Sequence, residues 1–144
     1  MPPLHPGNVL IVEDDPDIRK MLAALLNTAG FHAVPAEDGL EALHLLRAVR
    51  HRAPEAPCLI LLDLKMPRIG GFEFLEWRST QAHEDLRIIP VIVMSGSALE
   101  EDVKRAYQLG ANQYMVKPID WDSFRERMRL LGTVWKEHCE TPKV

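Results

Sequence analysis

The sequence predicts an α/β fold in which a doubly wound parallel sheet of five strands is covered by five helices. Short apolar runs alternate along the chain with longer segments whose apolar residues recur at helical spacing. The chain has 144 residues, 47% of them hydrophobic, which suits one domain with a full core. We expect the domain to span residues 8–138, between short flexible tails at residues 1–7 and 139–144.

Five apolar runs are the predicted strands. In chain order they cover residues 8–12, 32–36, 58–62, 91–94 and 113–116. The third run is apolar at every position and buries all of its side chains in the sheet. The second contains Pro35, which cannot donate to a sheet hydrogen bond, so this strand is placed at the sheet edge.

Helix start and stop signals lie between the first three strands. Asp15 can cap the first helix and Pro16 suits its first turn, whereas Gly30 is a suitable stop. The second helix begins at Asp38 and Gly39. Its inward residues are Leu40, Leu43, Leu46 and Val49.

Three further helices are predicted in the second half of the chain. One covers about residues 71–80, and a polar loop leads from it to the fourth strand. The next opens with Ser97 and Glu100 at capping-box spacing and ends at Gly110. The last starts near Asp120. Its apolar stripe is Trp121, Phe124, Met128, Leu131 and Trp135.

Bulk composition argues against several classes of protein. The net charge of −4 and pI near 5.8 argue against electrostatic binding to nucleic acid or to a membrane. No apolar run reaches the roughly 18 residues of a membrane span, and residues 1–7 lack the pattern of a secretory signal. Cys58 and Cys139 make no disulfide framework, and Cys58 is interpreted as a packing residue. We expect a cytoplasmic protein.

Polar residues follow four of the predicted strands at their carboxyl ends. Glu13 and Asp14 follow the first strand, Asp63 the third, Ser95 the fourth and Lys117 the fifth. In a doubly wound sheet, ligands bind beyond the carboxyl ends of the strands, where neighbouring strand ends meet. We therefore expect these side chains to form one site.

The acids of this group need a compensating cation, because neighbouring carboxylates raise each other's pKa. Mg²⁺ is the natural cation, since it prefers carboxylate, carbonyl and phosphate oxygens. The candidate metal ligands are Glu13, Asp14, Asp63 and the backbone carbonyl of Lys65.

The same residues match the needs of phosphoryl transfer to a carboxylate. Asp63 would attack phosphorus, while the metal, the Lys117 ammonium and the Ser95 hydroxyl would neutralise the phosphoryl oxygens. Gly96 leaves room for the transferred group. The product would be an aspartyl phosphate.

Over about residues 8–132 the chain resembles a response-regulator receiver domain. The motifs are Val12-Glu13-Asp14-Asp15, Leu62-Asp63-Leu64-Lys65-Met66-Pro67, Met94-Ser95-Gly96 and Val116-Lys117-Pro118. The resemblance implies a flavodoxin-like sheet with strand order 2-1-3-4-5 and a cis Lys117–Pro118 bond. The chain departs from the commoner pattern at four positions, namely Glu13 for Asp, Ser95 for Thr, Gly70 for Asp and Gly96 for Ala.

The resemblance also implies roles in a two-component phosphorelay. Asp63 accepts a phosphoryl group from a sensor histidine kinase and becomes 4-aspartylphosphate, with Mg²⁺ as cofactor. Asp14 binds the metal directly and Glu13 mostly through water, while Ser95 and Lys117 contact the phosphoryl group.

Ser95 and Tyr114 are the switch residues that this resemblance implies, although Tyr114 could also be a simple packing residue. The protein would catalyse only its own phosphorylation and dephosphorylation, so we do not class it as an enzyme.

A narrower resemblance points to the stand-alone regulators that partner cyanobacterial and bacterial phytochromes. It rests on residues 101–114 and 117–124 and on the longer polar segment at residues 81–89. This resemblance makes a bacteriophytochrome one candidate for the kinase.

Two alternatives and a surface hypothesis stay open. A receiver-like module could bind partners without phosphorylation, although the intact Asp63, Asp14 and Lys117 argue against this. A Mg²⁺-dependent phosphohydrolase would want a second acid two residues after the nucleophile, where this chain has Lys65. The large residues Trp121 and the more distal Trp135 suggest a homodimer surface on the last two helices and the fifth strand.

Overall fold

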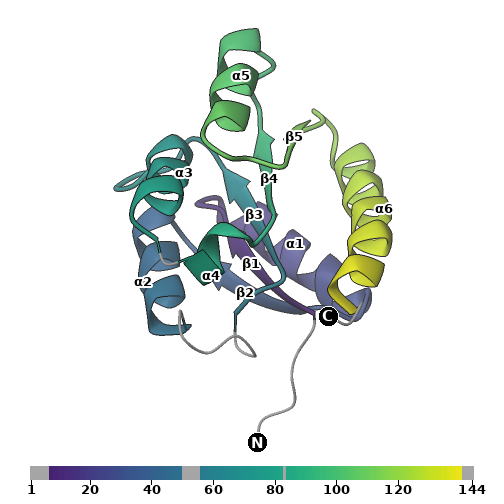
Figure 1. Ribbon diagram of the computed structural model, residues 1–144. Helices are drawn as coiled ribbons and strands as arrows, with labels where there is room; N and C mark the ends of the chain where they lie inside the picture. Colours follow the sequence, from purple (N-terminus) through teal and green to yellow (C-terminus); the bar gives the residue numbers. More distant parts are fainter. Residues whose placement is uncertain (1–6, 50–55, 83, 141–144) are drawn as a thin grey trace, which may run out of the picture.

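The computed structural model describes residues 7–49, 56–82 and 84–140, and it forms a parallel sheet with helices on both faces (Figure 1). The strands are β1 Asn8–Val12, β2 His32–Ala36, β3 Leu59–Asp63, β4 Val91–Ser95 and β5 Gln113–Val116. The helices are α1 Pro16–Thr28, α2 Gly39–Val49, α3 Gly71–Thr80, α4 Glu84–Arg87, α5 Glu100–Gln108 and α6 Trp121–Glu140. Every predicted strand is present within one residue of its expected bounds.

The strand order is β2-β1-β3-β4-β5 with every pair parallel, which confirms the predicted flavodoxin-like sheet. β1, β3 and β4 are buried along their whole length, as expected for central strands of a two-sided sheet. β2 is an edge strand, and Pro35 is exposed there in register with Ile11. The Pro35 signal in the sequence was therefore correct.

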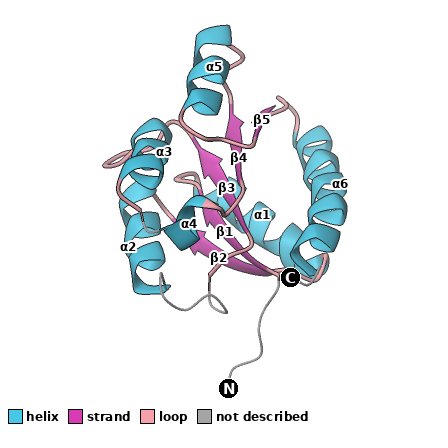
Figure 2. Cartoon of the chain, in the orientation of Figure 1, coloured by secondary structure: helices cyan, strands magenta, loops and turns pink. Residues whose placement is uncertain are grey.

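Helices flank the sheet on both faces (Figure 2), and an apolar core lies on each face. On one face, Leu22 and Leu26 of α1 and Phe124 and Met128 of α6 cover alternate strand residues. On the other face, α2, α3 and α5 cover the remaining strand residues, and Phe74 of α3 is completely buried there. Successive side chains of a strand point to opposite faces of the sheet, so they pack into different cores.

The helix ends show where local signals succeeded and where tertiary contacts replaced them. Asp15 caps α1 as predicted, because its Oδ1 accepts from the Asp17 and Ile18 N–H groups at 2.8 and 3.2 Å. The capping box predicted at Ser97 is wrong. α5 begins at Glu100, and the Ser97 hydroxyl instead accepts from the Leu99 N–H and donates to Asp102.

Further details differ from the sequence predictions. The loop before β4 contains the one-turn helix α4, and α6 continues through Glu140, so residues 139 and 140 are helical rather than part of a tail. The Lys117–Pro118 bond is trans, the isomer that prolyl bonds generally favour. Cys58 is buried in the core as predicted, but it is also disulfide-bonded. The sequence did not indicate this bond, because its formation depends on a distance across the fold.

No helix within the described ranges is both long enough and apolar enough to cross a bilayer. This agrees with the absence of a long apolar run in the sequence.

A buried arginine joins three elements on the face covered by α3. Arg78, in α3, is only 5% exposed and donates to the carbonyl oxygens of Arg87 at the end of α4 and of Ile89 before β4. It also donates to the Gly110 carbonyl after α5 at 3.4 Å. Burial lowers the pKa of this guanidinium. Arg78 therefore satisfies backbone acceptors that the ends of α4 and α5 leave unpaired.

We expect Arg78→Leu to lower the free energy of unfolding by about 3 kcal/mol, because the buried carbonyls of Arg87 and Ile89 would lose their charged donor. Urea denaturation would measure the change. Arg127→Leu, which removes an exposed arginine from α6, is the matched control and should change stability by less than about 0.5 kcal/mol. Equal effects of the two substitutions would contradict the bridging role of Arg78.

Candidate functional site

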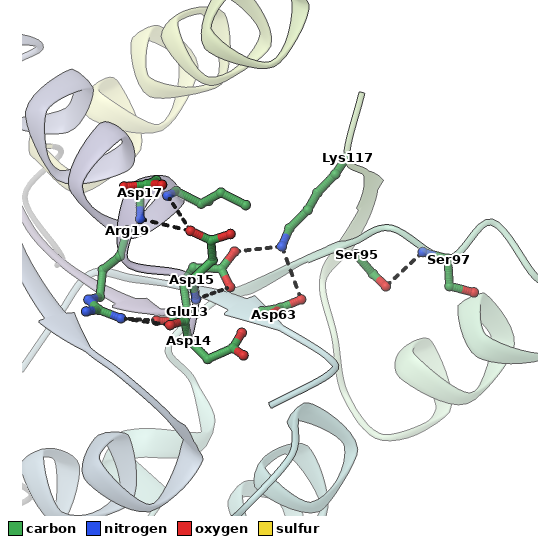
Figure 3. Close-up of polar contacts among 10 residues, drawn as sticks. Glu13, Asp14, Asp15, Asp17, Arg19, Asp63, Ser95, Ser97 and Lys117 are labelled. Carbon is green, nitrogen blue, oxygen red and sulfur yellow. Dashed lines mark hydrogen bonds and ion pairs between the residues drawn. The ribbon is translucent and has the colours of Figure 1, made fainter. Parts of the chain in front are cut away.

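The side chains predicted from the strand ends converge at the carboxyl edge of the sheet (Figure 3). A cavity of about 650 Å³ lies there. Its lining residues are Asp63, Lys65, Ser95, Gly96, Ser97, Ala98, Leu99 and Lys117. Asp63 ends β3 and Ser95 ends β4, while Lys117 directly follows β5. The parallel register therefore brings together residues that lie far apart in the sequence.

Three carboxylates form an acid cluster beside this cavity. One carboxylate oxygen each from Glu13, Asp14 and Asp63 lies within 4.8 Å of the others. Glu13 and Asp63 are buried, whereas Asp14 is exposed at the surface. An all-oxygen donor set with one solvent-facing side fits a hard divalent cation that retains water ligands, as Mg²⁺ does.

Lys117 contacts two members of the acid cluster. Its Nζ lies 2.6 Å from Glu13 Oε1 and 3.3 Å from Asp63 Oδ1 (Figure 3). The Lys117 backbone N–H also donates to the Ser95 carbonyl at 2.7 Å, which ties the end of β5 to the end of β4. The sequence predicted the contact with Asp63, but it did not indicate that Glu13 would make the shorter one.

Burial sets the protonation behaviour of the cluster. Desolvation, followed by the neighbouring Asp63, raises the pKa of Glu13 to about 8. Burial also raises the pKa of Asp63, although Lys117 opposes the shift. Burial alone would lower the pKa of Lys117, but its bonds to Glu13 and Asp63 raise it. Burial thus disfavours the charged form of both acids, and a bound cation would offset this cost.

Arg19 holds the loop that carries the first two acids, and sequence reasoning did not identify it. Its guanidinium donates to the backbone carbonyls of Glu13 at 2.8 Å and Asp14 at 3.3 Å (Figure 3). Arg19 lies one turn after the cap Asp15, and its N–H donates to the Asp15 carbonyl. Its position in the first turn of α1 was the available signal, because a long side chain there can reach back over the preceding loop.

Ser95 and Tyr114 meet at the loop between β4 and α5. Ser95 Oγ accepts from the Ser97 N–H at 3.1 Å, and the Tyr114 hydroxyl donates to the Ser97 carbonyl at 2.8 Å. Tyr114 is half-buried against the core, so its ring points inward. Gly96 has open space where a side chain would lie. Ser97 thus connects the two predicted switch residues, a link that the sequence did not reveal.

The loop after Asp63 passes beside the cavity. Lys65 lines the cavity, and its side chain is exposed to solvent. Gly71 begins α3 so close to Asp63 and Leu64 that a Cβ there would overlap the Asp63 carbonyl. The close start of α3 thereby fixes both ends of this loop.

A five-stranded doubly wound sheet with acids, a hydroxyl and a lysine at its carboxyl edge defines a receiver-type protein. The chain belongs to the response regulator receiver domain family, because the model of that family matches residues 9–129. This confirms the family resemblance of the sequence motifs and places the chain in two-component signalling.

Individual relatives cover nearly the whole chain. The polar-differentiation response regulator DivK of Brucella anthropi is 36% identical over 124 residues, which are 86% of this chain and 94% of DivK. The phosphorylated cyanobacterial phytochrome response regulator RcpA superposes with a TM-score of 0.82 at 28% identity, covering 95% of this chain and 99% of RcpA. The Mn²⁺-bound response regulator Rcp1 gives 0.80 at 28% identity, with coverages of 96% and 98%.

Glu13 should make the metal-free protein less stable as the pH rises. An acid whose pKa is higher in the folded than in the unfolded state stabilises the fold fully below its unfolded value, here 4.5, and loses that contribution as pH passes its folded value of about 8. Urea denaturation with a chelator at pH 5, 7 and 9 would measure this loss, and Glu13→Gln should reduce it. Identical pH profiles of the two proteins would contradict the raised pKa.

Proposed function

We propose that the chain is a phosphoacceptor of a cytoplasmic phosphorelay, in which Asp63 receives a phosphoryl group from a sensor histidine kinase with Mg²⁺ as cofactor. The observation that carries the proposal is the position of Asp63, which borders a cavity with Lys117 Nζ 3.3 Å away and lies within the acid cluster. Family membership and the phosphorylated state of RcpA support it.

In the proposed reaction, a carboxylate oxygen of Asp63 forms a bond to phosphorus while the bond from phosphorus to the histidine nitrogen of the kinase breaks. Glu13, Asp14, Asp63 and the Lys65 carbonyl would hold the metal ion, which supplies positive charge to the phosphoryl oxygens. The Mn²⁺-bound state of Rcp1 supports a divalent cation in this family.

Two side chains of the chain itself assist the transfer. Lys117 carries an ammonium group already next to Asp63, so it can stabilise the phosphoryl group without a large movement. Ser95 can donate its hydroxyl proton to a phosphoryl oxygen, because its Oγ now accepts from the Ser97 N–H and lines the cavity. Both groups are in place before the phosphoryl group arrives.

Phosphorylation would change the surface through Ser97. If Ser95 turns towards the phosphoryl group, the Ser97 N–H loses its present acceptor, and the Ser97 carbonyl that holds the Tyr114 hydroxyl can move with it. The β4–α5 loop would then communicate the state of Asp63 to β5 and α5.

Two partners belong to the proposal. The likeness to RcpA, a phytochrome response regulator, supports a bacteriophytochrome as the kinase. The proposed homodimer surface is formed by α5, β5 and α6. These elements expose the apolar side chains of Tyr107, Val116, Trp121, Leu130 and Val134. Most of the stripe predicted on the last helix faces the core, because Phe124 and Met128 are buried there and Leu131 and Trp135 pack against it.

The alternatives receive less support. A phosphorylation-independent module has no evident use for three clustered carboxylates with an ammonium group bound to two of them. A phosphohydrolase would need a general acid near the Lys65 position, and the exposed ammonium of Lys65 is a poor one. We propose that the chain acts only on itself and is not an enzyme.

Intact-mass spectrometry after incubation with acetyl phosphate and Mg²⁺ tests the proposed function. We expect one added phosphoryl group in the wild type and none in Asp63→Asn, which keeps the shape of the side chain but removes the attacking carboxylate. Asp15→Asn, which alters an acid that only caps α1, is the control and should be labelled normally. Labelling of Asp63→Asn would refute the assignment. A wild type that neither gains mass nor forms a beryllofluoride complex would do the same.

Sedimentation velocity at micromolar concentration tests the proposed dimer. Val116 is 36% exposed on β5, at the proposed surface. Val116→Glu would place a charge in the interface and should shift the protein from dimer to monomer. Ile88→Glu changes an apolar residue that is 73% exposed outside this surface, and it should leave the dimer intact. A monomeric wild type, with and without acetyl phosphate, would refute the dimer.

A further inference from the structure

An ion pair outside the acid cluster, between Asp38 and Arg68, includes a residue of the loop that passes beside the cluster. The β3–α3 loop, residues 64–70, joins the end of β3 to the start of α3 and contains Lys65, whose carbonyl is a proposed metal ligand. A backbone carbonyl cannot be removed by substitution and is placed only by the path of its loop. Whatever fixes this path therefore also fixes the ligand.

Arg68 in this loop has an unusual backbone conformation. Its φ angle is 65°, and within the described ranges no other residue except glycine has a positive φ. The left-handed conformation is unfavourable for a residue with a Cβ and persists where surrounding contacts determine it. The contacts of Arg68 should therefore explain the conformation.

Asp38 supplies those contacts. The Arg68 Nε donates to Asp38 Oδ2 at 2.5 Å, and a second guanidinium nitrogen pairs with the same carboxylate. The Asp38 side chain is 4% exposed, and its other oxygen accepts from the Glu41 N–H at the start of α2. Burial alone would raise the pKa of Asp38, but the bonds from Glu41 and Arg68 bring it below its usual value. The carboxylate is thus charged and held at both oxygens.

Backbone contacts fix the loop on both sides of Arg68. The Gly39 N–H donates to the Ile69 carbonyl at 3.1 Å, and the Gly71 N–H donates to the Leu64 carbonyl at 2.9 Å. A Cβ at Gly39 would overlap Ile69, so the start of α2 lies directly against the loop. Asp38 and Gly39 together therefore clamp the β3–α3 loop to α2.

We propose that the Asp38–Arg68 ion pair positions the β3–α3 loop, and with it the Lys65 carbonyl, so that the acid cluster binds a divalent cation more tightly. Asp38 and Arg68 are positioning residues in this inference, because neither is a ligand itself. The inference rests on the proposed function, since it assumes that the cluster holds Mg²⁺.

Charge effects and positioning effects predict opposite results for one of the two residues. Removing the negative charge of Asp38 weakens cation binding by electrostatics alone, whereas removing the positive charge of Arg68 strengthens it. Loss of positioning weakens binding in both cases. The direction of change in an Arg68 variant therefore separates the two explanations.

Isothermal titration calorimetry with Mg²⁺, repeated with Mn²⁺, tests the inference on Asp38→Asn, Arg68→Gly and the double variant. Asparagine retains an acceptor for the Glu41 N–H, and glycine tolerates the positive φ, so both variants keep the local fold accessible. We expect the dissociation constant to rise roughly tenfold in each single variant. The double variant should be no weaker than the weaker single variant, because both substitutions break the same pair.

Glu37→Gln is the matched control. It removes a neighbouring exposed carboxylate that lies 3.9 Å from Arg68, and it should leave the dissociation constant within twofold of the wild type. Thermal melting of each variant reports whether it is folded. If Asp38→Asn does not fold, the dissociation constant of Arg68→Gly decides the test.

The possible failures are distinct. Arg68→Gly that binds Mg²⁺ as tightly as the wild type, or more tightly, would overturn the positioning role while leaving the proposed function intact. A wild type that binds neither metal ion and gains no phosphoryl group would overturn the proposed function and this inference together.

Discussion

The burial of like charges at the carboxyl edge of the sheet is the constraint on which the rest of the site depends. Glu13 and Asp63 lie almost out of contact with solvent and share the ammonium group of Lys117, and the Asp14 carboxylate lies beside them. Such a group is costly in a stable protein unless a cation or a proton compensates it. The raised pKa values of both buried acids express that cost. The site is therefore prepared to bind positive charge.

The fold maintains this arrangement because its strongest elements end at the site. β1, β3 and β4 are fully buried, and their parallel register places Val12 beside Leu62 and Asp63 beside Met94. The residues that follow these strands cannot move apart without disturbing the core on both faces of the sheet. The flanking loops are held in a different way, by arginines that bind backbone or carboxylate oxygens. Apolar packing thus fixes the strand ends, whereas charged hydrogen bonds fix the loops between strands and helices.

Sequence alone predicted what short-range patterns determine. Apolar runs gave the strands, Pro35 gave the edge, and polar residues after the strands gave the members of the site. It missed features that depend on contacts between distant segments. α4 is too short for a helical repeat to show, and the Ser97 capping box was replaced by a bond from Ser97 to Asp102. No local pattern in the sequence indicates that Arg78 is buried or that Arg68 has a positive φ. The partners of these two arginines are carbonyl or carboxylate groups on other elements.

One departure from the family pattern affects how the site works. Glu13 is one methylene longer than the commoner Asp, and its carboxylate takes the closer contact with Lys117, 2.6 Å against 3.3 Å for Asp63. The ammonium group is therefore shared between Asp63, the nucleophile of the proposed reaction, and Glu13, which that reaction leaves unmodified. If Asp63 is phosphorylated as we propose, Lys117 would exchange Glu13 for a phosphoryl oxygen, and Glu13 would lose its partner unless a metal ion holds it. In the proposed reaction Glu13 would thus link metal binding at the site to the movement of Lys117.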